Sequence, residues 1–358
     1  MKVGIVGLSN AGKSTLFNAL TKGGAQTGDY PFTTIEPNVA VAQVPDERLE
    51  AVAKTVRSSE LVPATIDFHD IAGLVKGASE GEGLGNQFLA SIRETDAICQ
   101  VVRCHQDSGV PHPDGRIDPL ADIETIETEL VLADYEQVER RLGRVGKQAK
   151  TGDKEAIAEL GWLQAVHEAL AAGRPARTIP IPDLAPHAAR NLQALTTKPI
   201  LYVANVDEGD AEPPEAVASH AAANNAGVVA VSARIEGELS ELDPAEAEEM
   251  RDSYGVDPAG GLARLVRAAY DLLELLTFFT AGEDKEAVAR PLHRGATALE
   301  AAGTIHTEIM EAFVKAEAIG WEQLVECGGY APARDKGLLR IEGRDYVVQD
   351  GDVITIKV

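Results

Sequence analysis

Short apolar runs rich in β-branched residues recur along the chain, and stretches with helical periodicity lie between them. Runs of this length predict buried strands, and their alternation with helical stretches predicts an α/β fold. The six runs cover residues 2–7, 39–44, 65–71, 97–103, 199–205 and 227–233. Because these runs are largely apolar throughout, we expect a mostly parallel sheet that helices cover on both faces.

The stretch between the fourth and fifth runs carries no strand signal. In residues 122–150 apolar side chains recur at spacings of three to five, as on one face of an amphipathic helix. A second amphipathic helix is predicted over residues 155–173, after a turn at Gly152-Asp153. Two long helices joined by a turn predict a helical hairpin that is inserted into the sheet domain.

The C-terminal part of the chain changes pattern again. An apolar helix is predicted over residues 261–276, and from about residue 278 the pattern indicates a small α+β unit. Residues 344–358 predict two strands that are joined by a turn at Asp350-Gly351. At 358 residues the chain is too long for one compact core, so we expect two or three domains.

The charge of the chain limits the partners that it can bind. A formal net charge of −24 argues against wholesale coating of nucleic acid, because phosphate binding needs clustered lysine and arginine. Any such contact must come from a local basic patch. The three cysteines form no disulfide framework, no apolar run approaches the ~18 residues of a membrane span, and the strand at 2–7 leaves no room for a signal peptide. We therefore expect a cytoplasmic protein with no membrane partner.

The first apolar run leads into a glycine-rich loop with Gly7, Gly12, Lys13 and Ser14, and a helical stretch follows. The spacing G-x-x-x-x-G-K-S between a strand and a helix is typical of a phosphate-binding P-loop. The glycines let backbone N–H groups surround the phosphates, and Lys13 supplies a positive charge near the β- and γ-phosphates. The Ser14 hydroxyl is the expected Mg²⁺ ligand at the start of the helix.

A second phosphate-sensing motif, D-I-A-G, covers Asp70 to Gly73 at the end of the third run. An aspartate at this point holds Mg²⁺, and the N–H of Gly73 can reach the γ-phosphate. A threonine between the two motifs can close over Mg²⁺, with Thr34 as the first choice and Thr33 as its competitor. Together the motifs indicate a switch-type nucleoside triphosphatase.

Many switch GTPases place a glutamine after this motif to orient the attacking water, but this chain has Leu74. Leucine neither donates nor accepts a hydrogen bond, so another group must position the water. Asn10 in the P-loop is a candidate for holding K⁺ against the phosphates. His105 and His112 follow the fourth run, and each is interpreted as a solvated loop residue more readily than as a catalyst.

The fifth run ends in Asn205-Val206-Asp207-Glu208, where a guanine-binding loop has the sequence N-K-x-D. In that loop the aspartate accepts hydrogen bonds from guanine, and the lysine stem covers the base. Glu208 is one methylene too long and Val206 cannot stack as lysine does, so a poor guanine reader is predicted. Asn205 can still serve adenine N7 or N6, and Ser232 lies in the loop whose backbone supports the base. A one-residue shift that brings Asp207 into the guanine position is the rival interpretation.

The motifs now identify a family. They are GLSNAGKSTLFNALT, PFTTIEPNVAV, DIAGLVKGASEGEGLGNQFLASIRETDAI, VVRC, ELVLAD, NVDE, FFTAG, AAGTIHTE and EGRDYVVQDGDVI. In this order they cover nearly the whole chain and resemble the YchF or Obg-like ATPase family of translation-factor-related P-loop proteins. The resemblance implies a G domain at 1–121 and 197–277, an inserted α-helical hairpin (coiled coil) at 122–196, and a C-terminal α+β TGS domain at 278–358. It also implies a preference for ATP over GTP, slow hydrolysis and association with the ribosome.

The resemblance further implies roles for single residues. It implies that Ser14 and Thr34 serve Mg²⁺, that Val206 contributes at the base, and that His112 acts in hydrolysis. The residues that it implies at the phosphates are Asn10, Ala11, Gly12, Lys13, Ser14 and Thr15.

A basic patch lies on the first predicted hairpin helix, which carries Arg140, Arg141, Arg144, Lys147 and Lys150. Helical spacing places Arg140, Arg144 and Lys147 on one face. A solvated charged helix explains these residues without a partner. The resemblance instead favours contact with rRNA, which predicts binding that weakens steeply with salt.

Three functions stay open at this point. The first, which we favour, is a monomeric Mg²⁺-dependent ATPase whose nucleotide state switches how it docks on the ribosome. The second is a GTPase with a tolerant base loop. The third is a nucleotide-gated ribosome-binding module with negligible turnover, and Leu74 is the residue that favours it.

Overall fold

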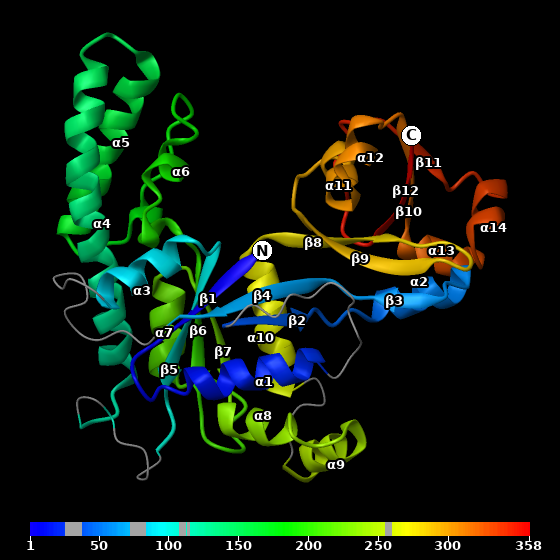
Figure 1. Cartoon of the computed structure of the whole chain (residues 1–358), viewed down its shortest axis with the longest axis horizontal. Helices are drawn as coiled ribbons and strands as arrows, with labels where there is room; N and C mark the ends of the chain where they lie inside the picture. Colours follow the sequence, from blue (N-terminus) through cyan, green and yellow to red (C-terminus); the bar gives the residue numbers. More distant parts are fainter. Residues whose placement is uncertain (26–37, 72–83, 107–111, 113–114, 255–259) are drawn as a thin grey trace. The chain divides into compact units, whose positions relative to one another are not determined.

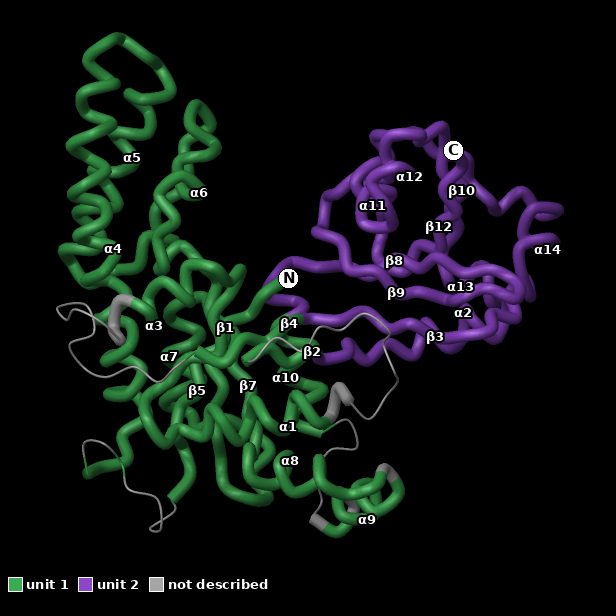
Figure 2. Tube along the Cα trace, viewed as in Figure 1, with its two compact units in different colours: residues 1–41, 67–269 green, residues 42–66, 270–358 purple. Residues whose placement is uncertain are grey.

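The chain forms two compact units in a computed structural model (Figure 2). The first unit comprises residues 1–41 and 67–269, and the second comprises residues 42–66 and 270–358. Residues 42–66, which the sequence pattern groups with the first sheet, thus pack with the C-terminal residues. The structure describes residues 1–25, 38–71, 84–106, 112, 115–254 and 260–358.

A six-stranded sheet with the order β2-β4-β1-β5-β6-β7 forms the centre of the first unit (Figure 1). Its strands are β1 (Lys2–Val6), β2 (Val39–Gln43), β4 (Thr65–Asp70), β5 (Ala97–Arg103), β6 (Ile200–Asn205) and β7 (Gly227–Val231). The pairs β1–β4, β1–β5, β5–β6 and β6–β7 are parallel. Every residue of β5 and β6 is buried, as expected for central strands between two helical layers. The prediction of a mostly parallel α/β sheet is confirmed.

Helices connect these strands and bury their apolar faces against the sheet. Side chains from α3, α4 and α7, including Phe88, Ile126 and Val217, form one core with residues of β1, β5 and β6. The helices of this unit outside the hairpin are α1 (Lys13–Ala25), α3 (Leu84–Arg93), α7 (Glu215–Ala223), α8 (Ala233–Leu239), α9 (Pro244–Tyr254) and α10 (Gly260–Leu272). The last of these ends in the second unit.

The predicted helical hairpin is confirmed as α4 (Pro119–Ala149) and α5 (Lys154–Ala171), which lie side by side (Figure 1). Val138, Leu163 and Val166 are fully buried between them. The hairpin continues through η1 (Ala176–Thr178), α6 (Ala188–Leu192) and η2 (Leu195–Thr197). Asp134 of α4 ties η2 to the hairpin, because its buried carboxylate accepts the backbone N–H groups at 195 and 196 over 2.8 and 2.7 Å.

A second six-stranded sheet, in the order β11-β10-β12-β8-β9-β3, belongs to the second unit. Its strands are β3 (Glu60–Val62), β8 (Leu275–Thr280), β9 (Glu286–His293), β10 (Lys315–Gly320), β11 (Arg340–Glu342) and β12 (Asp352–Lys357). Its helices are α2 (Glu47–Val56), α11 (Ala298–Ile305), α12 (Thr307–Glu311), α13 (Trp321–Cys327) and α14 (Tyr330–Asp335). Apolar residues of α11, such as Ala302, pack against Phe278 of β8 and Ile354 of β12 in the core of this unit.

Two expectations for the C-terminal part were wrong. Only β12 forms in residues 344–358, and it pairs with β10 and β8 instead of a neighbouring hairpin strand. The Tyr346 hydroxyl and the Gln349 N–H both donate to Asp352 Oδ2, at 2.7 and 3.0 Å, so the preceding segment folds around this carboxylate. The apolar helix ends four residues earlier than predicted, at Leu272, and β8 follows. No helix of the described part of the chain has the length and apolarity needed to span a bilayer.

Candidate functional site

The loop between β1 and α1 has backbone geometry that only certain residues allow. A Cβ on Gly7 would lie 2.6 Å from the carbonyl oxygen of Val101, so this position excludes any side chain. Gly12 has φ +100°, in the left-handed region that favours glycine, and Asn10 has φ +63°. The helix α1 begins directly at Lys13, so backbone N–H groups gather at the end of the loop. The geometry is that of a phosphate-binding loop.

The Lys13 ammonium and the Asp70 carboxylate interact electrostatically at this loop. Lys13 is only 7% exposed, and its Nζ donates to the carbonyl oxygen of Leu8 at 2.6 Å. Burial lowers the pKa of Lys13, and the Asp70 carboxylate opposes that shift. Burial likewise raises the pKa of Asp70, and Lys13 opposes it. Asp70 is positioned by the register of β4, which pairs it with Ile5 of β1.

These residues provide oxygen ligands that suit Mg²⁺. Ser14 is exposed in the first turn of α1, and Asp70 is half-buried at the end of the neighbouring strand. A hydroxyl and a carboxylate are hard ligands of the kind that Mg²⁺ prefers when phosphate and water complete its shell. The residues present therefore fit the ion. The further predicted residues Thr34 and Gly73, together with Thr33 and Leu74, lie outside the described residues.

Asn205 joins the phosphate loop to the loop after β7. Its Nδ2 donates to the carbonyl oxygen of Ala11 at 2.9 Å, and its Oδ1 accepts the N–H of Ala233 at 3.0 Å. The side chain is 5% exposed, so both bonds are shielded from water. Its amide thus connects the phosphate loop to the loop after β7.

The two acids of the base loop both have protein partners. Asp207 Oδ2 accepts the backbone N–H of Gln106 at 3.1 Å. Glu208 pairs with Arg234, whose Nε lies 3.3 Å from Glu208 Oε1. Val206 between Asn205 and these acids is 4% exposed, and it packs in an apolar cluster.

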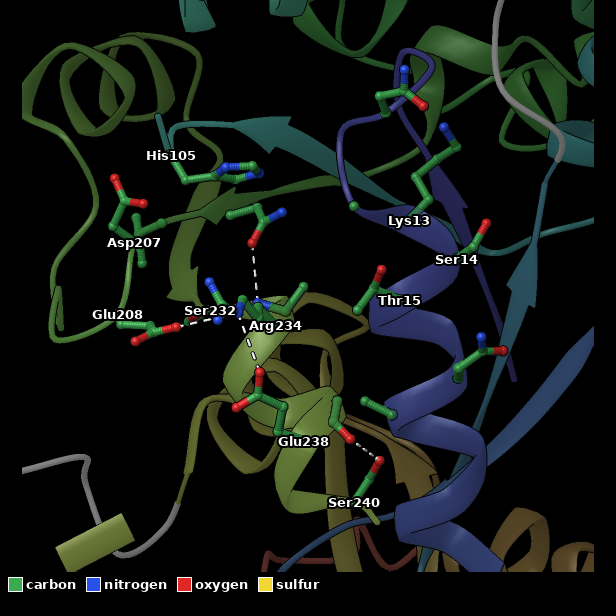
Figure 3. A pocket seen from close by; sticks show the side chains of 18 of the residues that line it. Lys13, Ser14, Thr15, His105, Asp207, Glu208, Ser232, Arg234, Glu238 and Ser240 are labelled. Carbon is green, nitrogen blue, oxygen red and sulfur yellow. Dashed lines mark hydrogen bonds and ion pairs between the residues drawn. The ribbon is translucent and has the colours of Figure 1, made fainter. Parts of the chain in front are cut away.

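A single pocket of about 1030 Å³ brings these loops together (Figure 3). Nine predicted binding residues line it: Asn10, Gly12, Lys13, Ser14, Thr15, Asn205, Val206, Glu208 and Ser232. Ala11, the remaining predicted one, is 2% exposed and does not line the wall. The lining residues that sequence reasoning did not assign to binding include Asn18, Lys22, Gln106, Arg234, Glu238 and Glu241. Helical spacing from Ser14 indicates Asn18 and Lys22, but the others have no local signal.

The two histidines after β5 have different environments. His105 lines the pocket, as Figure 3 shows. His112 does not line it, and its Nε2 lies 3.0 Å from Asp122 Oδ2 in the first turn of α4. The side chains of His112 and Asp122 are 5% and 7% exposed. The interpretation of His112 as a solvated loop residue was therefore wrong, because a buried carboxylate holds its imidazole.

The predicted basic residues of α4 divide into two groups. Arg140, Arg144, Lys147 and Lys150 are exposed, and we call these four the hairpin patch. Arg141 instead pairs with Glu159 of α5, with 2.5 Å between Nη2 and Oε1, and its side chain is 21% exposed. Because Arg141 is engaged within the hairpin, we remove it from the residues predicted to contact rRNA.

Comparisons with known proteins agree with this geometry. A family model described as 50S ribosome-binding GTPase matches residues 2–136, and the YchF GTPase C-terminal model, described as a protein of unknown function, matches residues 275–358. The chain is 46% identical over 360 residues to the ribosome-binding ATPase YchF of Bacillus subtilis, covering 99% of this chain and 98% of that one. It is 48% identical over 356 residues to the protein with the same description from Haemophilus influenzae, at the same coverage. The solved structure of the Schizosaccharomyces pombe YchF GTPase superposes with a TM-score of 0.87 at 32% identity, covering 100% of this chain and 97% of that one.

Proposed function

The chain belongs to the YchF family, and from this premise we propose that it is an Mg²⁺-dependent ATPase that docks on the ribosome according to its nucleotide state. It binds ATP, hydrolyses it slowly to ADP and phosphate, and takes GTP poorly. The relatives described as ribosome-binding ATPases support the ribosome as the partner. We further propose that it acts as a monomer.

The hydrogen bonding of the base loop is the observation that carries the preference for ATP. Guanine presents an acceptor at O6 and donors at N1 and N2, so a guanine site needs an unengaged N–H and a suitably placed carboxylate. Here the N–H of Ala233 is already bonded to Asn205, and Asp207 accepts the backbone N–H of Gln106. A guanine that enters this pocket must break such bonds or leave its own polar groups unpaired. Adenine has neither the N1–H donor nor the O6 acceptor, so it needs neither the Ala233 N–H nor a carboxylate at N1.

The phosphate end of the pocket supports the hydrolysis step. We propose that Lys13 neutralises charge on the transferred phosphoryl group and that Ser14, Asp70 and Thr34 hold Mg²⁺. When bound, this ion would neutralise charge on the β- and γ-phosphates. Gly73 is proposed to donate its N–H to the γ-phosphate.

Two further residues belong to the proposal for hydrolysis. Asn10 is proposed to hold K⁺ beside the phosphates, which a higher turnover rate in potassium than in sodium buffer would support. His112 is proposed to act in hydrolysis, with Asp122 fixing the orientation of its ring. Because His112 does not line the pocket, His112→Ala should lower turnover without changing ATP affinity.

The hairpin patch is the proposed rRNA contact. Three of its exposed side chains lie on α4 and the fourth, Lys150, is at the C-cap of that helix, so they form a local positive surface on a chain of net charge −24. Phosphate contacts of this kind release counterions, and ribosome binding should therefore weaken steeply as salt rises.

Calorimetric titration of nucleotide-free protein with ATP and with GTP, in the presence of Mg²⁺ and K⁺, tests the proposed function. ATP should bind at least ~10-fold more tightly, a difference of ~1.4 kcal/mol. Lys13→Ala serves as the matched control, because it removes the positive charge that the phosphates contact but leaves the base loop intact. Tighter binding of GTP would refute the base argument, and failure to hydrolyse ATP even with ribosomes present would refute the ATPase assignment.

A further inference from the structure

The base end of the pocket lacks the lysine that covers the base in N-K-x-D loops. Val206 occupies that position and is 4% exposed, so its short side chain faces the apolar cluster behind the loop. Another group must therefore cover the face of a bound base. Among the residues that the structure describes along this wall, His105 and Arg234 carry flat groups of the kind that stack on bases, and Arg234 is paired with Glu208 of the base loop.

Arg234 reaches the base end from the first turn of α8. Its Nε lies 3.3 Å from Glu208 Oε1 of the base loop and 3.2 Å from Glu238 Oε1 of the next helical turn. Figure 3 shows the guanidinium between these two carboxylates and beside Ser232. Carboxylates from two different elements thus hold the group by its Nε edge, and a guanidinium held by an edge can present its planar face to a flat partner.

This arrangement does little for the stability of the fold. The Arg234 side chain is 73% exposed, and ion pairs with that exposure contribute little in water. A long side chain that is exposed, oriented by two acids and located on the wall of a nucleotide pocket therefore suits a ligand contact better than a structural one.

We propose that Arg234 covers the adenine base by stacking its guanidinium plane on the ring. This inference rests on the proposed binding of ATP. Arginine planes stack on nucleobases through dispersion and cation–π attraction. Every purine has such a π-face, so the stack adds affinity for the base without choosing between adenine and guanine. The choice between the two purines stays with the hydrogen bonds of Asn205, Ala233 and Asp207.

Calorimetric titration of three ligands into nucleotide-free protein tests this role: Mg-ATP, Mg-GTP and Mg-tripolyphosphate, which has no base. Arg234→Ala should weaken ATP binding by about 2- to 30-fold. It should weaken any measurable GTP binding by the same factor and leave tripolyphosphate binding unchanged. Arg234→Lys has a stem that can cover a base but an ammonium group without a plane. Its affinity for ATP should lie between those of the original chain and Arg234→Ala.

Arg190→Ala is the matched control, because it removes one exposed cation from α6 outside the pocket and changes the net charge equally. It should bind all three ligands like the original chain. Equal weakening of ATP and tripolyphosphate by Arg234→Ala would overturn the proposal, since Arg234 would then act on phosphate. Unchanged ATP affinity, or a changed ratio of ATP to GTP affinity, would overturn it as well. If the original chain binds ATP no better than tripolyphosphate, the proposed function fails first, and that outcome is separate from a failure of Arg234 alone.

Discussion

Replacing Asn205 with alanine tests whether one amide holds the phosphate loop and the base loop together. Asn205→Ala deletes the bond from Nδ2 to Ala11 and the bond from the N–H of Ala233 to Oδ1. At 5% exposure of Asn205, the two backbone groups left behind are shielded from water, and each unpaired group costs about 1–3 kcal/mol. We therefore expect the free energy of unfolding of the first unit to fall by about 2–6 kcal/mol.

Thermal unfolding followed by circular dichroism measures this loss. For a unit of this size each kcal/mol lowers the midpoint by roughly 2–4 °C, so the midpoint should fall by at least about 4 °C. Hydrogen exchange at the Ala233 amide should also lose protection, because its acceptor is gone. Asn191→Ala, an exposed asparagine of α6, is the matched control and should leave the midpoint unchanged. An Asn205→Ala midpoint within 1 °C of the original chain, which is about the effect of 0.5 kcal/mol or less, would refute the reasoning.

Three other changes have outcomes that the structure specifies. Gly12→Ala would put a Cβ against Asn205 Nδ2 at a φ of +100°, so ATP affinity should fall by ten-fold or more in a titration, about 1.4 kcal/mol or more. Charge reversal of the hairpin patch should abolish ribosome co-sedimentation at low salt, whereas Arg141→Gln should lower the unfolding midpoint and leave co-sedimentation intact. Burial alone would raise the pKa of Asp350, but the Arg48 guanidinium helps to hold it below its ordinary value. This depressed pKa adds stability that is fully present above pH ~5 and is lost as pH falls below ~4. The gap in unfolding midpoint between the original chain and Asp350→Asn should thus be wide at pH 7 and narrow at pH 3, and a constant gap would contradict the argument.

Local rules explain which parts of the fold could be predicted. The six apolar runs became the strands of the first sheet, and the apolar spacing between the fourth and fifth runs became the two hairpin helices. The expected strand at 344–349 failed because alternation alone cannot show that one carboxylate, that of Asp352, will bind the residues before it. Local pattern also could not predict that residues 42–66 belong to the C-terminal unit, because β3 pairs with a strand more than 200 positions later.

The site shows the same division between local and distant information. The P-loop was predictable because a single spacing encodes its strand, its turn and its helix. The role of Asn205 as a bridge was not, since its partner Ala11 lies 194 positions earlier in the chain. His112 was misjudged because a histidine in a loop usually faces solvent, whereas its imidazole pairs with a buried aspartate in the first turn of α4.

The base loop illustrates why a sequence motif alone does not determine which base a pocket binds. The sequence left open whether Asp207 or Glu208 reads guanine, because a one-residue shift of the motif decides which acid occupies the guanine position. In the folded chain the question depends on engaged partners, and the N–H of Ala233 is bonded to the same Asn205 that a guanine reader would also require. Changing Glu208 to aspartate would shorten one acid without releasing that N–H. On the proposed function, discrimination against guanine comes from bonds that the protein makes to itself, and affinity for adenine comes from what covers its faces.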